Sequence, residues 1–76
     1  MIATHNIQSI NFNEKEMELE IDGRKLKIAL VNVSNKLLNA SEIERNFYKV
    51  SASGYGIHWP LIDEDLSVDA LVKIAS

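Results

Sequence analysis

The stretch GYGIHWPLIDEDLS, residues 54–67, holds most of the side chains in this sequence that could do chemistry. It contains one of the two histidines, the single tryptophan, the single proline and three consecutive acids. A histidine near carboxylates could act in acid–base catalysis, carboxylates could ligate a cation, and an aromatic side chain beside acids could bind a protein. Each of these chemistries needs further residues at defined positions, and those positions distinguish between them.

A cation site is suggested by an alternating run that is similar to the start of an EF-hand loop: Asp63, Asp65, Ser67 and Asp69. The position that requires glycine in such a loop holds Val68, and the position of the bidentate acid holds Ile74. A zinc site made from His5, His58 and an acid lacks the spacing of zinc motifs. We therefore expect no metal and no cofactor.

Catalysis would use His58 as a base with an acid from residues 63–65, or a pair of carboxylates in acid and base roles. A chain of 76 residues has little room to enclose a concave site. The sequence also contains no nucleophile elbow, glycine-rich phosphate loop or HExxH motif. We expect no catalytic residues and no enzyme activity. A small hydrolase ranks third among the possible functions, after protein recognition and a structural role.

Protein recognition needs the fewest missing parts, because aromatic side chains anchor interfaces and carboxylates attract a basic partner. The expected partner-binding residues are Tyr55, His58, Trp59, Asp63, Glu64 and Asp65. In the main alternative, a structural or assembly domain, the same stretch only closes the fold. Trp59 would then lie in the core, His58 would point outward, and the acids would precede a helix N-terminus, where negative charge is favoured.

Length and composition predict a single domain, residues 1–76, in the cytoplasm. The net charge is −3 and the eight basic residues do not form one stripe, which disfavours direct nucleic-acid binding. The absence of cysteine fits a reducing compartment, and no stretch approaches the roughly 20 apolar residues of a membrane span. Both a monomer and an oligomer are compatible with the sequence.

The stretch MELEIDGRKLKIAL, residues 17–30, predicts a β-hairpin, since Asp22-Gly23 between alternating runs favours a type I′ turn. This turn sets the register, with Ile21 opposite Arg24, Glu20 opposite Lys25, Leu19 opposite Leu26, Glu18 opposite Lys27 and Met17 opposite Ile28. This register places Met17, Leu19, Leu26 and Ile28 on one face and the charged pairs on the other.

Other elements follow from caps and periodicity. We expect a strand at about 4–12, a short helix capped by Ser34, and a second one begun by a capping box of Ser41 and Glu44. A strand at about 48–52 and a short strand through residues 57–59 come next. The apolar spacing of LSVDALVKIAS predicts a C-terminal helix with Ser67 as its N-cap.

These elements predict the α+β class: a small antiparallel β-sheet, made of an N-terminal meander plus a later β-hairpin, with short middle helices and a C-terminal helix packed on it. In this arrangement Pro60 stops the strand pairing, and the acids at 63–65 lead directly into the helix.

The segment LLNASEIERNFYKVSASGYGIHWPLIDEDLSVDALV resembles the small bacterial family catalogued as domain of unknown function 2442. The resemblance extends over about residues 17–73 and implies a compact α+β fold. The motif positions present here are Arg45, Gly54, Gly56, Trp59, Pro60, Asp63, Asp65, Leu66 and Ser67. Phe47 departs from the family pattern, in which a bulkier aromatic such as tryptophan is expected.

What the resemblance implies about activity is an antitoxin or regulatory role, because some members are associated with small toxin-like partners. Other members are joined to a helix-turn-helix domain, and we expect no such domain in this chain. The resemblance supplies no catalytic residues. It therefore adds a class of partner, a small basic toxin, to the protein-recognition reading.

Overall fold

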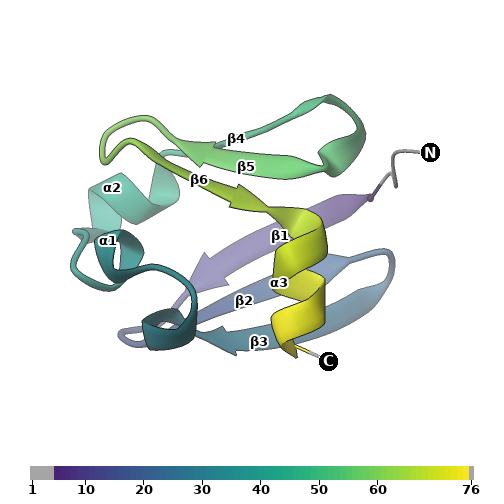
Figure 1. Cartoon of the computed structure of the whole chain (residues 1–76), viewed down its shortest axis with the longest axis horizontal. Helices are drawn as coiled ribbons and strands as arrows, with labels where there is room; N and C mark the ends of the chain where they lie inside the picture. Colours follow the sequence, from purple (N-terminus) through teal and green to yellow (C-terminus); the bar gives the residue numbers. More distant parts are fainter. Residues whose placement is uncertain (1–4, 76) are drawn as a thin grey trace.

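Two three-stranded antiparallel sheets lie one above the other in the computed structural model, which describes residues 5–75 (Figure 1). The first contains β1 (Ile7–Phe12), β2 (Glu16–Ile21) and β3 (Arg24–Ala29), and the second contains β4 (Lys49–Val50), β5 (Gly56–Trp59) and β6 (Glu64–Ser67). The helices are α1 (Asn35–Leu38), α2 (Glu42–Asn46) and α3 (Val68–Ala75), with 3-10 turns η1 (Leu30–Asn32) and η2 (Ala52–Gly54). The α+β class is confirmed, and the later hairpin belongs to a separate sheet.

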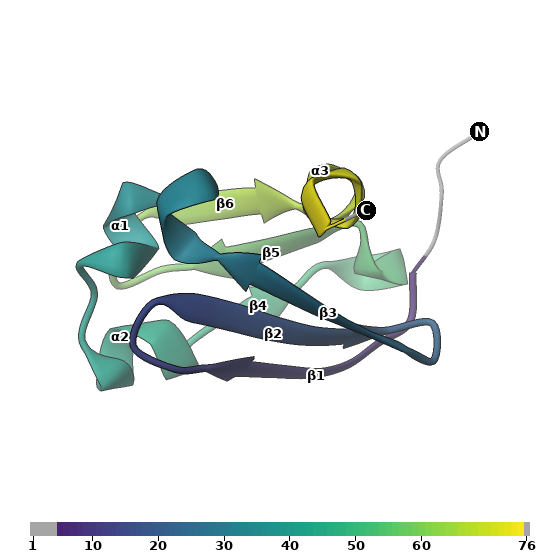
Figure 2. The ribbon, with the colours of Figure 1, turned by 90° about the horizontal axis from the view of Figure 1, so that it is seen from below.

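The helices close the space between the sheets, with α1 and α2 at one end and α3 towards the other (Figures 1 and 2). The core between the layers consists of Ile10, Met17, Leu19, Ile21, Ile28, Leu30, Leu37, Ile57, Trp59, Val68 and Leu71. None of the helices within residues 5–75 is long and apolar enough to cross a membrane.

The β2–β3 hairpin has the predicted register at all five pairs. Asp22 and Gly23 both have positive φ, 52° and 81°, as a type I′ turn requires. Met17, Leu19 and Ile28 are buried, whereas the paired charges lie on the other face, Glu18 with Lys27 and Glu20 with Lys25. Alternation and the turn residues were therefore sufficient to define this element.

β1 begins at Ile7, later than the predicted start near residue 4, which lies outside the described residues. His5 donates its backbone N–H to the carbonyl oxygen of Ser53 at 2.9 Å, so it is engaged with another segment and not with β2. The pairing of β1 with β2 is also irregular between Ile7 and Ser9. The side chain of Gln8, the residue between them, accepts the Gly23 N–H at 2.9 Å.

The second sheet differs most from the sequence prediction. The strand expected at 48–52 contains only Lys49 and Val50, and the acids do not lead directly into the helix. Pro60 instead begins a turn in which Asp63 has a φ of 52°, and residues 64–67 return antiparallel to β5. Acids and serine have low strand propensity, so local sequence hid a strand that pairing with β5 stabilises.

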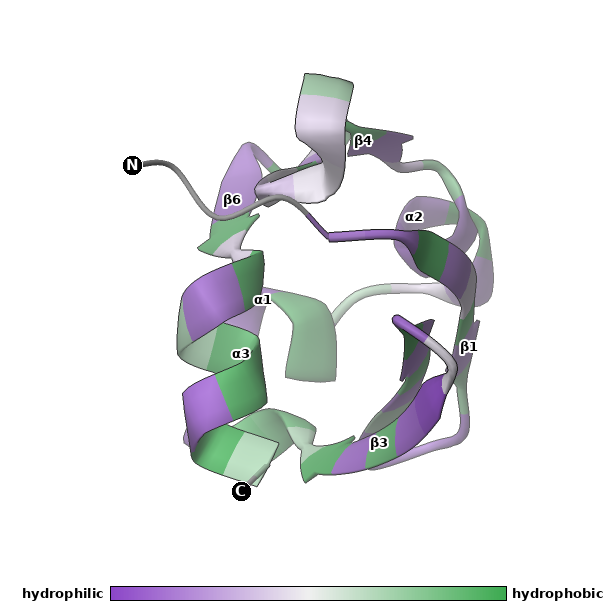
Figure 3. Cartoon of the chain, turned by 90° about the vertical axis from the view of Figure 1, so that its right-hand side faces the viewer, coloured by the Kyte–Doolittle hydropathy of each residue, from purple (hydrophilic) through white to green (hydrophobic). Residues whose placement is uncertain are grey.

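The predicted helix caps are present. The Ser34 hydroxyl accepts the Leu37 N–H at 3.1 Å, and Ser41 and Glu44 form the reciprocal capping box. The Ser67 hydroxyl accepts the Ala70 N–H at 3.3 Å, although Ser67 also ends β6, so strand and helix are continuous. Figure 3 shows that α3 turns its hydrophobic side towards the interior, as its periodicity predicts.

Candidate functional site

The outer face of the second sheet carries a shallow hollow of about 490 Å³, which we call the Gly56 hollow. Its lining consists of Lys49, Val50, Ser51, Tyr55, Gly56, Ile57, His58, Asp65, Leu66 and Ser67. Three of the six predicted partner-binding residues, Tyr55, His58 and Asp65, therefore meet at one surface. The hollow lies over Gly56 because that position in the middle strand has no side chain.

A polar row crosses the three strands on this face. Lys49 is opposite His58 in one ladder, and His58 is opposite Asp65 in the other. The Nδ1 atom of His58 lies 2.7 Å from Oδ1 of Asp65, and these side chains are 41% and 74% exposed. His58 thus points outward, as strand alternation predicts, and its acidic partner is Asp65.

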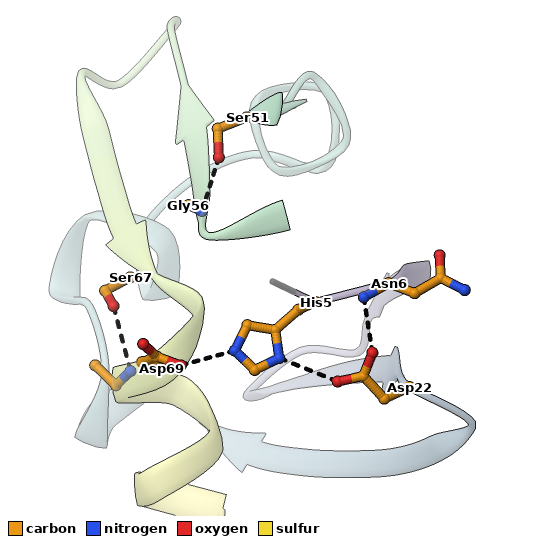
Figure 4. Close-up of polar contacts among 8 residues, drawn as sticks. His5, Asn6, Asp22, Ser51, Gly56, Ser67 and Asp69 are labelled. Carbon is orange, nitrogen blue, oxygen red and sulfur yellow. Dashed lines mark hydrogen bonds and ion pairs between the residues drawn. The ribbon is translucent and has the colours of Figure 1, made fainter. Parts of the chain in front are cut away.

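The serine hydroxyls of the hollow are engaged in the fold. Ser51 accepts the Gly56 N–H at 2.9 Å, and Ser67 caps α3 (Figure 4). Two apolar side chains of the lining are accessible, since Tyr55 is 53% and Val50 40% exposed, whereas Ile57 is buried. An open surface with an aromatic ring beside a carboxylate is chemically suited to contact another protein.

Trp59 is fully buried, so its predicted role as a partner-binding side chain is wrong for this structure. Its Nε1–H donates to the Arg45 carbonyl oxygen at 2.9 Å, and its ring packs against Phe12 and Tyr48 with centroids 6.4 and 6.3 Å away. A buried indole with a satisfied N–H is a core residue. The structural alternative placed this residue correctly.

The three consecutive acids have three different surroundings. Asp63 is an exposed turn residue whose carbonyl oxygen accepts a hydrogen bond from Lys36 Nζ at 2.9 Å. Glu64 accepts hydrogen bonds from the Ser34 hydroxyl at 2.5 Å and from the Asp65 backbone N–H at 3.0 Å. Only Asp65 faces the Gly56 hollow. Glu64 and Asp65 are neighbours in β6, so their side chains point to opposite faces of the sheet. The sequence would have predicted this difference if β6 had been recognised.

Arg45, a motif position, is buried and binds backbone carbonyl groups. Its guanidinium donates to the carbonyl oxygens of Leu37, Leu38, Asn13 and Glu14 at 2.8–3.0 Å. Its Cζ atom also lies 5.6 Å from the centroid of the Phe12 ring. Because these groups come from the end of α1 and the β1–β2 turn, Arg45 joins the middle helices to the first sheet.

The remaining motif positions shape the backbone of the second sheet. Gly54 packs against the backbone of His5, Pro60 is exposed at the start of the turn, and half-buried Leu66 pairs with Ile57.

A second polar cluster was missed by sequence reasoning, which considered His5 only as a zinc ligand. The ring of His5 lies between two carboxylates, with Nδ1 3.0 Å from Asp22 Oδ2 and Nε2 2.7 Å from Asp69 Oδ1 (Figure 4). The hydrogen bond to Asp69, followed by that to Asp22, raises the pKa of His5 above its ordinary value of 6.5. No local pattern could reveal this cluster, because its members are 17 and 64 residues from His5.

Each histidine is thus bound to carboxylates in its own cluster. Within the part of the chain that the structure describes, no three His, Cys, Asp or Glu side chains are grouped so as to hold a metal ion.

Comparison with known proteins supplies a family. Neither the curated proteins nor the solved structures that were compared include a match to the chain. Residues 7–76 match the model of the family described as "Protein of unknown function (DUF2442)", and the chain belongs to that family.

Proposed function

We propose that this chain is a small protein-interaction module, antitoxin-like or regulatory, which binds a protein partner stoichiometrically in the bacterial cytoplasm. The observation that carries the proposal is the Gly56 hollow, a depression of about 490 Å³ in a solvent-facing sheet surface. Half-exposed Tyr55 lines it together with the exposed carboxylate of Asp65. Binding would cover the face of the partner and thereby block its activity.

The chemistry of the hollow favours a partner that presents a basic side chain next to an apolar one. Asp65 supplies an exposed negative charge, and the chain as a whole carries a net charge of −3. Such a field attracts basic proteins and aligns them during encounter. Lys49 lies at the other end of the polar row and requires a neutral or acidic group of the partner opposite it. The partner surface that fits the hollow is therefore mixed in charge.

The proposal assigns no catalytic step and no cofactor to this face. A His58–Asp65 pair could serve as a base, but the two serine hydroxyls of the lining, those of Ser51 and Ser67, accept backbone N–H groups and are thereby held in the fold. The pair therefore serves recognition, with His58 holding the Asp65 carboxylate towards the partner. Direct contact with nucleic acid or a membrane has no part in the proposed mechanism.

A second candidate is a structural or assembly domain, and the inward contacts of the motif favour it. Trp59 fills the core, Arg45 binds four carbonyl groups, and Glu64 holds Ser34 at the start of α1. On this view the motif specifies only the fold. The two candidates differ in one respect, namely whether the exposed residues of the hollow bind anything.

Copurification with the product of the neighbouring gene, followed by size-exclusion chromatography and calorimetric titration, tests the proposal. We expect a complex of defined stoichiometry. Tyr55→Ala should weaken it about 30-fold, as a hot-spot loss of roughly 2 kcal/mol implies. Asp65→Asn should weaken it and reduce its dependence on salt, because it removes the exposed charge.

The matched control is Glu14→Gln, which removes an exposed acid outside the hollow and should leave affinity unchanged. Thermal unfolding of each variant shows whether the fold is retained. If the folded protein stays alone, or if Tyr55→Ala binds as well as the native chain, the structural candidate replaces the proposal.

A further inference from the structure

His5 lies where three separate segments meet, as Figure 4 shows. It precedes β1, while Asp22 belongs to the β2–β3 turn and Asp69 to the first turn of α3. The side chain of His5 is 13% exposed, and those of Asp22 and Asp69 are 49% and 56% exposed. One imidazole ring thus connects the first sheet to the helix that follows the second.

The geometry specifies the protonation state of this ring. Ionised carboxylates can only accept hydrogen bonds, so both ring nitrogens must donate when each faces one. A neutral imidazole has one N–H, and its other nitrogen would direct a lone pair at a carboxylate. The observed bridge between Asp22 and Asp69 therefore requires the charged form of His5.

The charges around the ring have the same consequence. The pKa of His5 is raised by the Asp69 carboxylate of α3 and by the Asp22 carboxylate of the β2–β3 turn. Desolvation of the ring by burial acts in the opposite direction. The Asn6 N–H, followed by His5, lowers the pKa of Asp22 below its ordinary value of 3.8, and Arg24 acts in the same direction. The contribution of the His5–carboxylate bridge to the stability of the folded chain is therefore fully present between pH 3.8 and 6.5. This contribution is lost as pH rises through the elevated pKa of His5.

The backbone of His5 extends the connection to the second sheet. Its N–H donates to the Ser53 carbonyl oxygen at 2.9 Å, and its own carbonyl oxygen lies directly against Gly54. Ser53 and Gly54 form the turn that precedes Tyr55. A change in the position of His5 would therefore reach both sheets and α3.

We propose that His5 is a proton-operated clamp, which fastens the segment before β1 to the β2–β3 turn and to α3 when protonated and releases Asp69 when deprotonated. Asp69 is the carboxylate released because Asp22 also accepts the Asn6 backbone N–H at 2.8 Å, which keeps it beside this segment. Deprotonation loosens the first turn of α3 while the β2–β3 turn stays attached. The clamp is independent of whether the Gly56 hollow binds a partner.

An NMR titration of the full chain between about pH 5 and 8, the range in which histidine changes charge, tests the clamp. The ring resonances of His5 should titrate above pH 6.5, and the backbone amides of the first turn of α3 should shift with the same midpoint. Asp69→Asn should lower the His5 midpoint and remove the amide transition. This follows because the asparagine amide can donate to a bare ring nitrogen and keep the bridge at high pH.

Asp65→Asn is the matched control, since it makes the same change beside the other histidine and should leave the His5 midpoint and the α3 amides as in the native chain. Asp22→Asn should also lower the His5 midpoint, so the result does not depend on one variant. A His5 midpoint at or below 6.5 in the native chain would overturn the proposal. So would α3 amides that show no transition at that midpoint.

Discussion

Replacement of Gly54 by alanine is expected to destabilise the fold more than the same replacement at Gly23 or Gly56. Gly54 has a φ of 66°, and a Cβ atom added there would lie 2.0 Å from the carbonyl oxygen of His5 and 3.0 Å from its carbonyl carbon. Both neighbours are backbone atoms, so no side-chain rotation can relieve the contact. The segment that carries His5 would have to move away from the β4–β5 connection.

The magnitude has two parts. An alanine in the left-handed region costs about 1–2 kcal/mol, and forcing extra atoms into packed surroundings costs about 1–3 kcal/mol more. A domain of 76 residues has a total unfolding free energy of roughly 4–11 kcal/mol. Gly54→Ala should therefore lose about 2–5 kcal/mol, a large share of the total.

Gly23→Ala separates the two parts, because Gly23 also has a positive φ, 81°, but no atom lies within 4 Å of the place that an added methyl group would take. It should lose only the conformational part, about 1–2 kcal/mol. Urea unfolding followed by the fluorescence of Trp59, the single and fully buried tryptophan, measures both variants. Equal losses for the two variants would refute the packing of His5 on Gly54.

Two further side-chain networks give predictions for the same unfolding assay. Arg45→Lys should lower the free energy of unfolding by about 2–4 kcal/mol, because an ammonium group cannot reach the four carbonyl groups that the guanidinium binds. The control Arg24→Lys, at an exposed position, should leave it nearly unchanged. Similar losses for both variants would contradict the role of Arg45. Glu64→Gln should lose about 1 kcal/mol by weakening the bond from Ser34, and Asp63→Asn should lose almost nothing, since asparagine tolerates positive φ. The reverse order would show that Asp63 is the structural acid.

Local signals in the sequence were sufficient wherever a turn or cap specified the backbone. Asp22-Gly23 set the register of the hairpin, and the hydroxyls of Ser34, Ser41 and Ser67 all cap helices as predicted. These features depend on residues close together in the chain. They make up most of the first sheet and every helix start that was predicted.

The second sheet could not be predicted in the same way, because its last strand depends on partners elsewhere in the chain. Glu64 and Asp65 have poor strand propensity and look like a helix-preceding acidic run. Ser34 and His58 hold them, and both contacts are made by side chains that sequence spacing does not connect. Of the three acids predicted to bind a partner, Glu64 thus has a structural contact, whereas Asp63 and Asp65 are exposed and Asp65 lines the Gly56 hollow.

In the candidate site, too, local patterns were predictable from the sequence and contacts between distant segments were not. Strand alternation correctly predicted that His58 points outward, and Tyr55 and Asp65, two of the predicted partner-binding residues, both line the Gly56 hollow. The partner-binding role predicted for Trp59 is wrong because its side chain is buried. The sequence did not show which face of the sheet this side chain occupies. The His5 cluster was out of reach, since it forms only when α3 packs beside the β2–β3 turn.

An amide hydrogen-exchange footprint of the complex tests whether the Gly56 hollow binds a protein partner. We predict that binding protects residues 49–50, 55–58 and 65–67, and leaves the β2–β3 hairpin unchanged. Protection confined to the hairpin or to α2, with the amides around the hollow exchanging as in the free protein, would contradict the claim.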